Sequence, residues 1–111
     1  MSQHRVKGFR IAGTHCGLKA DSKPDIALLV SDYPCQAAGV FTTNRVKAAP
    51  VVVSERRLRG GRCQVVLVNS GNANACTGAQ GKRSAVVLAK AAASSLGVRQ
   101  SLVLPASTGV I

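Results

Sequence analysis

The second half of the chain contains the feature that most constrains its fold: two apolar runs separated by a polar loop and a periodic helix. Residues 64–68 are almost continuously apolar, which is typical of a strand buried on both faces. A loop of glycine, asparagine and other small residues follows at 69–78, and residues 101–104 form a second short apolar run. The order predicts a strand, a loop, a helix and a second strand that leads into residues 105–111.

The helix between these strands is the clearest element of the sequence. Its apolar residues recur at three- and four-residue steps, which predicts one buried face; they are Ala85, Leu88, Ala89, Ala92 and Leu96. Gly97 stands where a left-handed C-terminal cap is expected. A helix that joins two buried strands indicates a mixed α and β fold.

The first half predicts a meander of short strands. Residues 6–12, 26–30 and 37–42 have strand-like composition, and turn signals at Gly13, 21–24 and 32–34 separate them. Pro50 can occupy the first turn of a helix, where a missing N–H does no harm. Residues 51–58 are ambiguous, because three valines favour a strand while the following residues favour a helix; we expect a helix.

Length and charge limit the function classes. With 111 residues the chain is one domain at most, or a piece of one. Its formal charge is +11, which suggests an anionic ligand, an acidic partner chain or nucleic acid. Stacking aromatics among the basic residues would favour nucleic acid, but the chain has only Phe9, Tyr33 and Phe41. A small basic module that binds nucleic acid or an acidic partner stays an alternative function that rests on charge alone.

The cysteines, Cys16, Cys35, Cys63 and Cys76, are far apart and show no zinc-ligand spacing. We therefore expect no metal site. No signal peptide precedes them, which favours free thiols in a reducing compartment. No apolar run is long enough to span a bilayer, so a cytoplasmic protein without a membrane partner is expected.

The loop at 69–78 is a candidate phosphate site, because it lies between a predicted strand and a predicted helix. Gly81-Lys82 could supply part of a P-loop, but Cys76 stands where its first glycine belongs and Arg83 replaces the magnesium-binding hydroxyl residue. A nucleotide site is therefore a weak hypothesis. The simpler interpretation is that the loop asparagines bond nearby backbone groups and hold a tight loop.

The histidines are poor catalytic candidates. His4 lies in a terminal segment and is expected to be exposed. His15 and Cys16 are adjacent, so their side chains tend to point apart, although a Cys–His pair stays open as a hypothesis. Asp21, Asp25, Asp32 and Glu55 are the only acids, which leaves little material for a carboxylate dyad or a Ser-His-Asp triad.

Ser107-Thr108-Gly109-Val110-Ile111 is the strongest local candidate. A hydroxyl residue followed by glycine can present a side-chain donor and a bare backbone N–H side by side, which is what an oxyanion hole needs. An ordinary turn after a strand is the competing interpretation.

Several ordered blocks resemble the ornithine acetyltransferases, the bifunctional glutamate N-acetyltransferase/ornithine acetyltransferase enzymes of arginine biosynthesis. The blocks span nearly the whole chain: 8–19, Asp25-Ile-Ala-Leu-Leu-Val30, Ala38-Gly-Val-Phe-Thr-Thr-Asn-Arg-Val-Lys-Ala-Ala-Pro50, Asn69-Ser-Gly-Asn-Ala-Asn-Ala-Cys-Thr-Gly78 and Ser107-Thr-Gly-Val-Ile111. The resemblance implies an α+β chain that is part of a four-layer α-β-β-α sandwich, similar to the N-terminal-nucleophile hydrolases.

The resemblance also implies a mechanism. In this family a precursor cleaves itself before a threonine, and the freed threonine carries the acetyl group from N-acetylornithine to glutamate; bifunctional members also use acetyl-CoA, and no metal or resident cofactor is required. Thr108 and Gly109 would supply the two oxyanion donors. Gly suits its role because it has no Cβ to block the substrate carbonyl.

One departure from the family pattern is decisive. The family's cleavage segment and its nucleophilic threonine do not occur in residues 1–111. We therefore expect residues 1–111 to be a single partial domain, the N-terminal portion of an α chain, inactive alone and partnered by a β chain in an α-β heterotetramer. An aminopeptidase of similar fold is a further alternative.

Overall fold

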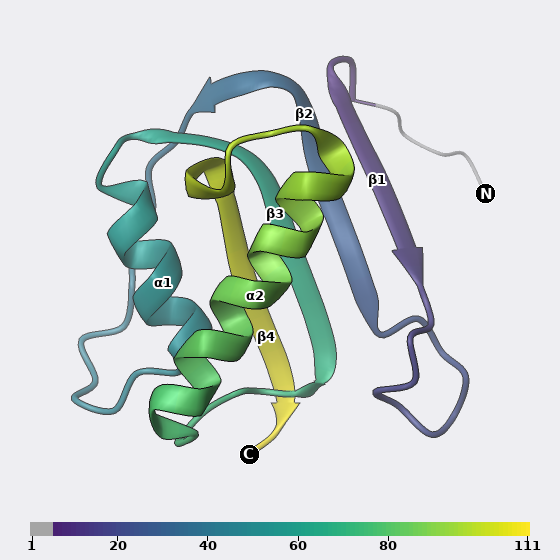
Figure 1. The fold of residues 1–111 in the computed structure, drawn as a ribbon, viewed down its shortest axis with the longest axis vertical. Helices are drawn as coiled ribbons and strands as arrows, with labels where there is room; N and C mark the ends of the chain where they lie inside the picture. Colours follow the sequence, from purple (N-terminus) through teal and green to yellow (C-terminus); the bar gives the residue numbers. More distant parts are fainter. Residues whose placement is uncertain (1–5) are drawn as a thin grey trace.

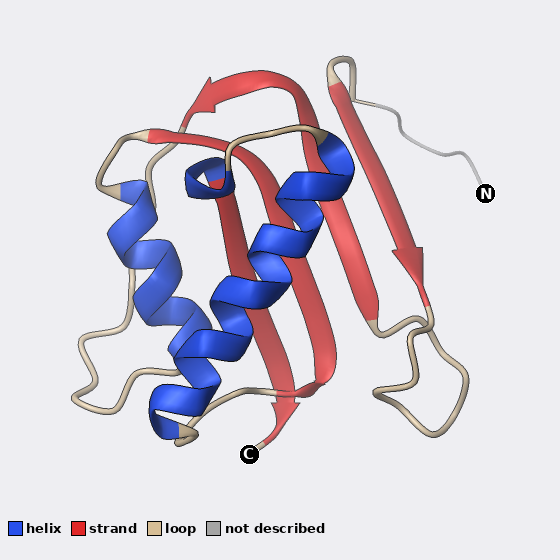
Figure 2. Cartoon of the chain, in the orientation of Figure 1, coloured by secondary structure: helices blue, strands red, loops and turns tan. Residues whose placement is uncertain are grey.

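A computed structural model describes residues 6–111 and shows a mixed α and β fold (Figures 1 and 2). His4, which the sequence analysis singled out, lies outside the described residues. The elements in chain order are β1 (Phe9–Thr14), β2 (Ile26–Gln36), α1 (Ala49–Leu58), β3 (Arg62–Asn72), α2 (Gly78–Leu96), the 3-10 turn η1 (Gln100–Leu102) and β4 (Val103–Val110).

The four strands form one sheet in the order β1-β2-β3-β4. The first three are antiparallel to their neighbours, whereas β4 runs parallel to β3. A parallel pair needs a long crossover connection, and α2 supplies it between β3 and β4, which matches the strand–helix–strand order predicted from the sequence. The α+β fold class expected from the sequence is confirmed.

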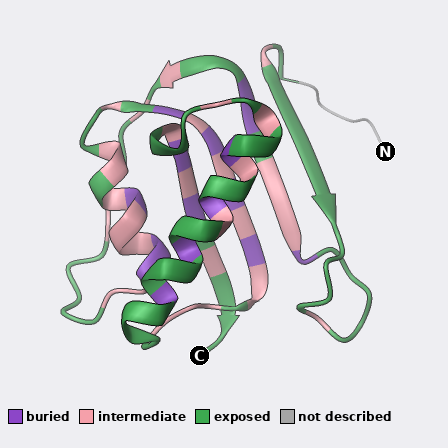
Figure 3. Cartoon of the chain, viewed as in Figure 1, coloured by how far each residue is buried: buried purple, intermediate pink, exposed green. Residues whose placement is uncertain are grey.

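The core lies between the sheet and α2 (Figure 3). Val65 and Val103 are fully buried, as is Ala89 on the facing side of the helix. Alanines at four-residue steps, Ala85, Ala89 and Ala93, give α2 a shallow surface, so the helix can approach the sheet closely. Gly97 adopts the left-handed conformation at φ 67° and ends the helix as predicted.

Helix α1 lies on the same face of the sheet as α2 and covers the free edge of β4 (Figure 1). The Ser54 hydroxyl donates to the Pro105 carbonyl at 2.6 Å, and Arg57 donates to the Val103 carbonyl at 2.7 Å. These bonds supply donors to two carbonyls of β4 that have no partner strand, because β4 lies at the edge of the sheet. Burial lowers the pKa of Arg57. The helix expected to begin near Pro50 is thus confirmed.

The opposite face of the sheet has no helix over it among residues 6–111. An apolar row crosses all four strands there, because the pairing places Ile11, Leu29, Val66 and Leu104 side by side. Ile11 is 78% exposed and Leu29 is 38% exposed. An apolar sheet face of this kind is one that a second layer covers in layered folds.

Two sequence predictions about the first half of the chain were wrong. Residues 37–42 are not a strand, because β3 begins at Arg62 opposite Gln36 and leaves nothing further to pair with. Residues 32–34 are not a turn between elements but belong to β2, where the register shifts between Val30 and Cys35. Pro34 is tolerated at this irregularity because a bulge already interrupts the ladder.

The remaining boundaries shifted by a few residues. The first strand lies at 9–14 rather than 6–12, and β3 extends to Asn72, into the predicted loop. The last strand begins at Val103 after the turn η1. None of the helices found within residues 6–111 is long and apolar enough to cross a membrane.

Candidate active site

Thr108 and Gly109 lie in the last part of β4, and both are exposed. They are strand residues, paired in register with Ser70 and Gly71 of β3, so the competing interpretation of an ordinary turn is wrong. The pairing fixes the backbone of this part of the edge strand β4 to β3. The site is therefore accessible while its backbone is anchored.

Gly109 and Gly71 approach each other too closely for any side chain. Gly109 has φ 129° and Gly71 has φ 104°, backbone conformations that favour glycine. A Cβ built on Gly109 would lie 2.5 Å from the carbonyl carbon of Gly71. The structure thus gives a reason for glycine at position 109 that is separate from substrate access.

Side-chain bonds join β3 and β4 immediately before the site. The Ser107 hydroxyl donates to the Asn69 side-chain oxygen at 2.5 Å, and the Asn69 amide nitrogen donates to the Asn72 carbonyl at 2.8 Å. Beyond the site, the N–H of Ala73 donates to the Val110 carbonyl at 3.0 Å. Thr108 and Gly109 are therefore held from both sides.

Ser107 and Thr108 project to opposite faces of the sheet, because side chains alternate along a strand. Ser107 follows the buried Val103 and Pro105 at two-residue steps and faces the helices, whereas Thr108 continues the open face of Leu104 and Ala106. The Thr108 hydroxyl thus belongs to the uncovered face. A substrate group that accepts a hydrogen bond from this hydroxyl would approach from that side of the sheet.

A cavity of about 880 Å³ lies on the helix side of the same region. Asn69 and Ser107 line it from the strands, and the loop residues Cys16 and Leu18 line it opposite α2. Polar residues from the start of α2 and the preceding loop contribute the rest of its polar lining: Asn72, Asn74, Thr77, Gln80, Arg83 and Ser84. Thr108 and Gly109 do not line this cavity.

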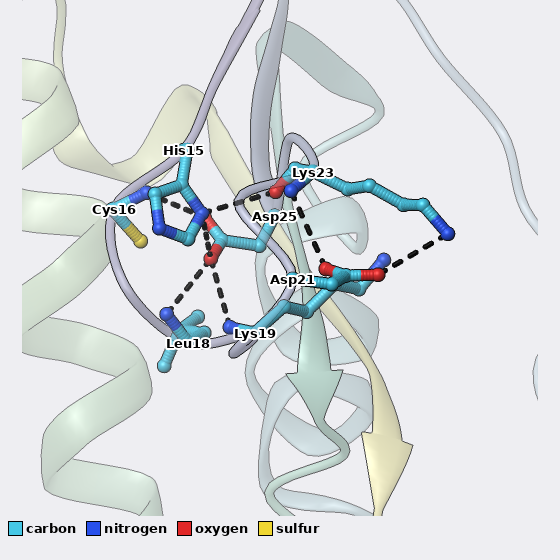
Figure 4. A network of polar contacts seen from close by, with 7 residues as sticks. All are labelled: His15, Cys16, Leu18, Lys19, Asp21, Lys23 and Asp25. Atoms are coloured by element: carbon cyan, nitrogen blue, oxygen red, sulfur yellow. Dashed lines mark hydrogen bonds and ion pairs between the residues drawn. The ribbon is translucent and has the colours of Figure 1, made fainter.

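The loop over this cavity is organised by one buried carboxylate (Figure 4). Asp25 is 2% exposed, and it accepts backbone N–H bonds from Cys16 at 2.7 Å, Leu18 at 2.8 Å and Lys19 at 3.0 Å. Burial alone would raise the pKa of Asp25, but these bonds stabilise the charged form and hold the pKa well below its usual range. The His15 ring nitrogen Nδ1 lies 3.1 Å from the same carboxylate.

His15 and Cys16 therefore meet at Asp25 rather than at each other. The Cys16 sulfur makes no hydrogen bond to His15 in the described structure, which a Cys–His pair requires. The carboxylate of Asp25 raises the pKa of the Cys16 thiol by accepting its hydrogen bond, so a reactive thiolate is disfavoured. The geometry does not favour a Cys–His nucleophile here.

The Gly/Asn loop bonds to itself, as the simpler interpretation of the sequence predicted. The Thr77 hydroxyl donates to the Asn74 side-chain oxygen at 2.6 Å, and the Asn74 amide donates to the Gly81 carbonyl at 3.0 Å. These side chains occupy the start of α2, where a P-loop would hold phosphate. Within residues 6–111 no three His, Cys, Asp or Glu side chains gather closely enough to hold a metal ion.

Sequence reasoning missed two residues of this region. Asn69 was assigned to a loop but is a buried strand residue, and the signal lay in the run that precedes it, since residues 65, 67 and 69 share one face of β3. Asp25 was counted only as one of four acids. Asp25 stands directly before the apolar residues of β2, and this position favours burial of its side chain. The count of acidic residues did not reveal this.

Comparison with known proteins identifies the family to which the chain belongs. The family model described as the ArgJ family matches residues 10–111. The arginine biosynthesis bifunctional protein ArgJ of Syntrophotalea carbinolica is 50% identical over 107 residues, covering 96% of this chain and 27% of that protein. The same-named protein of Symbiobacterium thermophilum is 55% identical over 106 residues, covering 94% and 26%. The chain thus spans about a quarter of these relatives' length.

Two crystal structures share the fold. The arginine biosynthesis bifunctional protein of Bacillus halodurans superposes with a TM-score of 0.90 at 38% identity, over 95% of this chain and 55% of that one. The ornithine acetyltransferase of Mycobacterium tuberculosis, solved in complex with ornithine, superposes with a TM-score of 0.91 at 43% identity, over 95% and 57%. The family match, the curated relatives and the shared fold lead to one conclusion: the chain belongs to the ArgJ family.

Proposed function

We propose that the protein of which this chain forms part transfers an acetyl group from N-acetylornithine to glutamate in arginine biosynthesis. Two findings support the substrates: the relatives are named as bifunctional enzymes of arginine biosynthesis, and a relative of the same fold has been solved with ornithine. The chain corresponds to only 27% of one such relative. The reaction is therefore assigned to the whole protein, and this chain supplies part of the site.

The proposed reaction passes through an acetyl-threonine. A threonine at the start of a separate β chain attacks the acetyl carbonyl of N-acetylornithine, with its own α-amino group taking the hydroxyl proton. The new C–O bond gives a tetrahedral oxyanion. Collapse of this intermediate breaks the C–N bond, and the proton passes to the leaving amine of ornithine. Glutamate then attacks the acetyl-threonine through the same steps in reverse order.

Thr108 and Gly109 are proposed as the donors to that oxyanion, through the Thr108 hydroxyl and the Gly109 backbone N–H. The observation that carries this assignment is their exposure on a strand whose backbone is fixed to β3, because an oxyanion hole needs donors that do not reorganise during the reaction. Thr108 also lies on the open sheet face, where the second sheet of a four-layer sandwich would bring the nucleophile.

The assembly follows from the same proposal. The β chain covers the open face, and α and β chains associate as a heterotetramer. The +11 charge of this chain suits substrates and segments that carry carboxylates. Acetyl-CoA can serve as a second acetyl donor to glutamate, no metal or resident cofactor takes part, and the reaction belongs to the cytoplasm.

The test is an acetyl-transfer assay on the whole protein with N-acetylornithine and glutamate, followed by peptide mapping of the enzyme after brief exposure to N-acetylornithine alone. We expect N-acetylglutamate and ornithine in equal amounts and one acetylated threonine outside residues 1–111. Hydrolysis of amino-acid amides without acetyl transfer would support an aminopeptidase instead. Acetylation of a residue within this chain would contradict the proposed mechanism.

A further inference from the structure

Within residues 6–111, the side chain of Asn69 makes hydrogen bonds to both strands next to the proposed oxyanion donors. Its oxygen accepts from the Ser107 hydroxyl on β4, and its nitrogen donates to the Asn72 carbonyl on β3. Ser107 directly precedes Thr108 in the chain, and Asn72 lies opposite Val110 in the strand pairing. The bonds of one amide thus reach residues on either side of the Thr108-Gly109 pair.

The Asn69 side chain is buried and its position is specified by these bonds. The residue is 7% exposed, and a buried amide is costly unless its donor and acceptor are both used. It stands at a position of β3 where the preceding residues of the same face, Val65 and Leu67, are apolar. A polar residue at the end of an apolar face therefore needs an explanation beyond packing of the core.

Beyond the backbone pairing of β3 and β4, side-chain packing gives little control over the position of the donors. Gly71 and Gly109 face each other with no side chains, so packing between side chains cannot fix their separation. Beyond them, the Ala73 N–H holds the Val110 carbonyl at 3.0 Å. Before them, the Asn69–Ser107 bond makes the corresponding connection.

We infer that Asn69, acting through Ser107, is a positioning residue for the Thr108-Gly109 oxyanion site. The inference rests on the proposed function. Oxyanion donors act at about 2.7–3.1 Å from the developing charge, and a displacement of about 1 Å can lower the rate about a hundredfold. Asn69 contacts no reacting atom in this account; it fixes the strand from which the Thr108 hydroxyl projects.

Ser107 offers the cleaner test, because it is half-buried and its hydroxyl faces the cavity of about 880 Å³. In the whole enzyme, we expect Ser107→Ala to lower kcat about tenfold while KM and the melting temperature stay close to those of the native protein. Ser107→Thr keeps the hydroxyl, and the cavity can receive the added methyl group, so this variant should restore kcat. Ser84→Ala removes an exposed hydroxyl that lines the same cavity from α2 and serves as the matched control.

Asn69→Asp keeps one of the two hydrogen bonds of the Asn69 side chain and removes the other. The aspartate can still accept from Ser107, but it places a carboxylate oxygen against the Asn72 carbonyl in place of a donor. We expect kcat to fall in this variant too, with KM unchanged. If Asn69→Asp does not fold, the Ser107 series decides the question alone.

A double variant distinguishes positioning from an independent effect. If Asn69 and Ser107 act on the oxyanion donors, the loss of kcat in Ser107→Ala/Thr108→Ala is smaller than the product of the two single losses, because the removed Thr108 hydroxyl can no longer be misplaced and only the Gly109 N–H still can. The positioning role would be overturned if the loss of kcat in the double variant equals the product of the losses in the two single variants. It would also be overturned if kcat in Ser107→Ala is unchanged. Either result leaves the oxyanion proposal intact. Full activity of Thr108→Ala would instead overturn the oxyanion proposal and this inference with it.

Discussion

Gly109 of β4 lies directly opposite Gly71 of β3, so closely that a Cβ on Gly109 would come within 2.5 Å of the Gly71 carbonyl carbon. The neighbouring atoms are backbone, which cannot swing aside as the end of a flexible side chain can. Both residues also have positive φ. The last part of the β3–β4 pair is therefore built around two glycines, of which Gly109 has no room for a Cβ.

Gly109→Ala is expected to disturb this part of the sheet severely. The strained φ alone costs on the order of 1–3 kcal/mol, and the backbone clash forces β4 away from β3. In the whole enzyme we expect a lower melting temperature and loss of most acetyl transfer. Gly13→Ala is the matched control, because a Cβ there meets its nearest atom at an ordinary 3.6 Å; a Gly109→Ala variant as stable and active as this control would show that the close approach is wrong.

Asp25→Asn is expected to loosen the loop at residues 15–25. The variant loses the charge that accepts three backbone N–H bonds, so the Leu18 and Lys19 amides should exchange with deuterium faster at neutral pH. Asp21→Asn, which changes an exposed carboxylate of the same loop, should leave this exchange unchanged. Equal exchange in the native protein and Asp25→Asn would contradict the role of the carboxylate.

The same carboxylate predicts a pH dependence. Because the folded pKa of Asp25 lies below its unfolded value of about 3.9, its stabilising contribution is fully present above pH values near 4–5. That contribution is lost as the pH falls through the folded pKa, where the carboxylate is protonated in both states. Melting temperatures between pH 3 and 7 should therefore fall less steeply in Asp25→Asn than in the native protein; parallel curves would refute this prediction.

Leu29→Asp tests whether the open sheet face is covered in the whole protein. Leu29 stands in the apolar row with Ile11 and Val66 and is 38% exposed in this chain. If a second sheet packs there, a carboxylate at position 29 is buried without a partner, and the assembled protein should be destabilised by several kcal/mol. Val87→Asp, on the exposed side of α2 at 64% exposure, is the control; equal melting temperatures for the two variants would mean that the face stays open.

Periodicity was enough to predict α2 and the strand–helix–strand order around it, but not the strand ends. The alanine and leucine spacing of 85–96 and the cap at Gly97 reflect local physics, and both were confirmed. Residues 37–42 have the composition of a strand, but a strand needs a partner, and β3 begins too late to provide one. Where β-pairing ends depends on the neighbouring strand, and local sequence does not contain that information.

The candidate site was predicted in part. Ser107-Thr108-Gly109 suggested two adjacent donors, and the family membership is confirmed, whereas their catalytic role stays a prediction. The contact of Gly109 with Gly71 and the bond from Ser107 to Asn69 join residues 38 positions apart. Such contacts arise from the parallel register of β3 and β4, which the sequence pattern suggested only as a strand–helix–strand order.

The most direct test of the account is the kinetics of Thr108 variants in the whole enzyme. Thr108→Ala removes the proposed side-chain donor, and loss of one oxyanion donor lowers kcat by about 10²–10³-fold. Thr108→Ser keeps the hydroxyl and should restore most of the activity, while Thr14→Val, at an exposed threonine ending β1, should change nothing. The account predicts a large loss in kcat with KM nearly constant for Thr108→Ala; native kcat in that variant would contradict it.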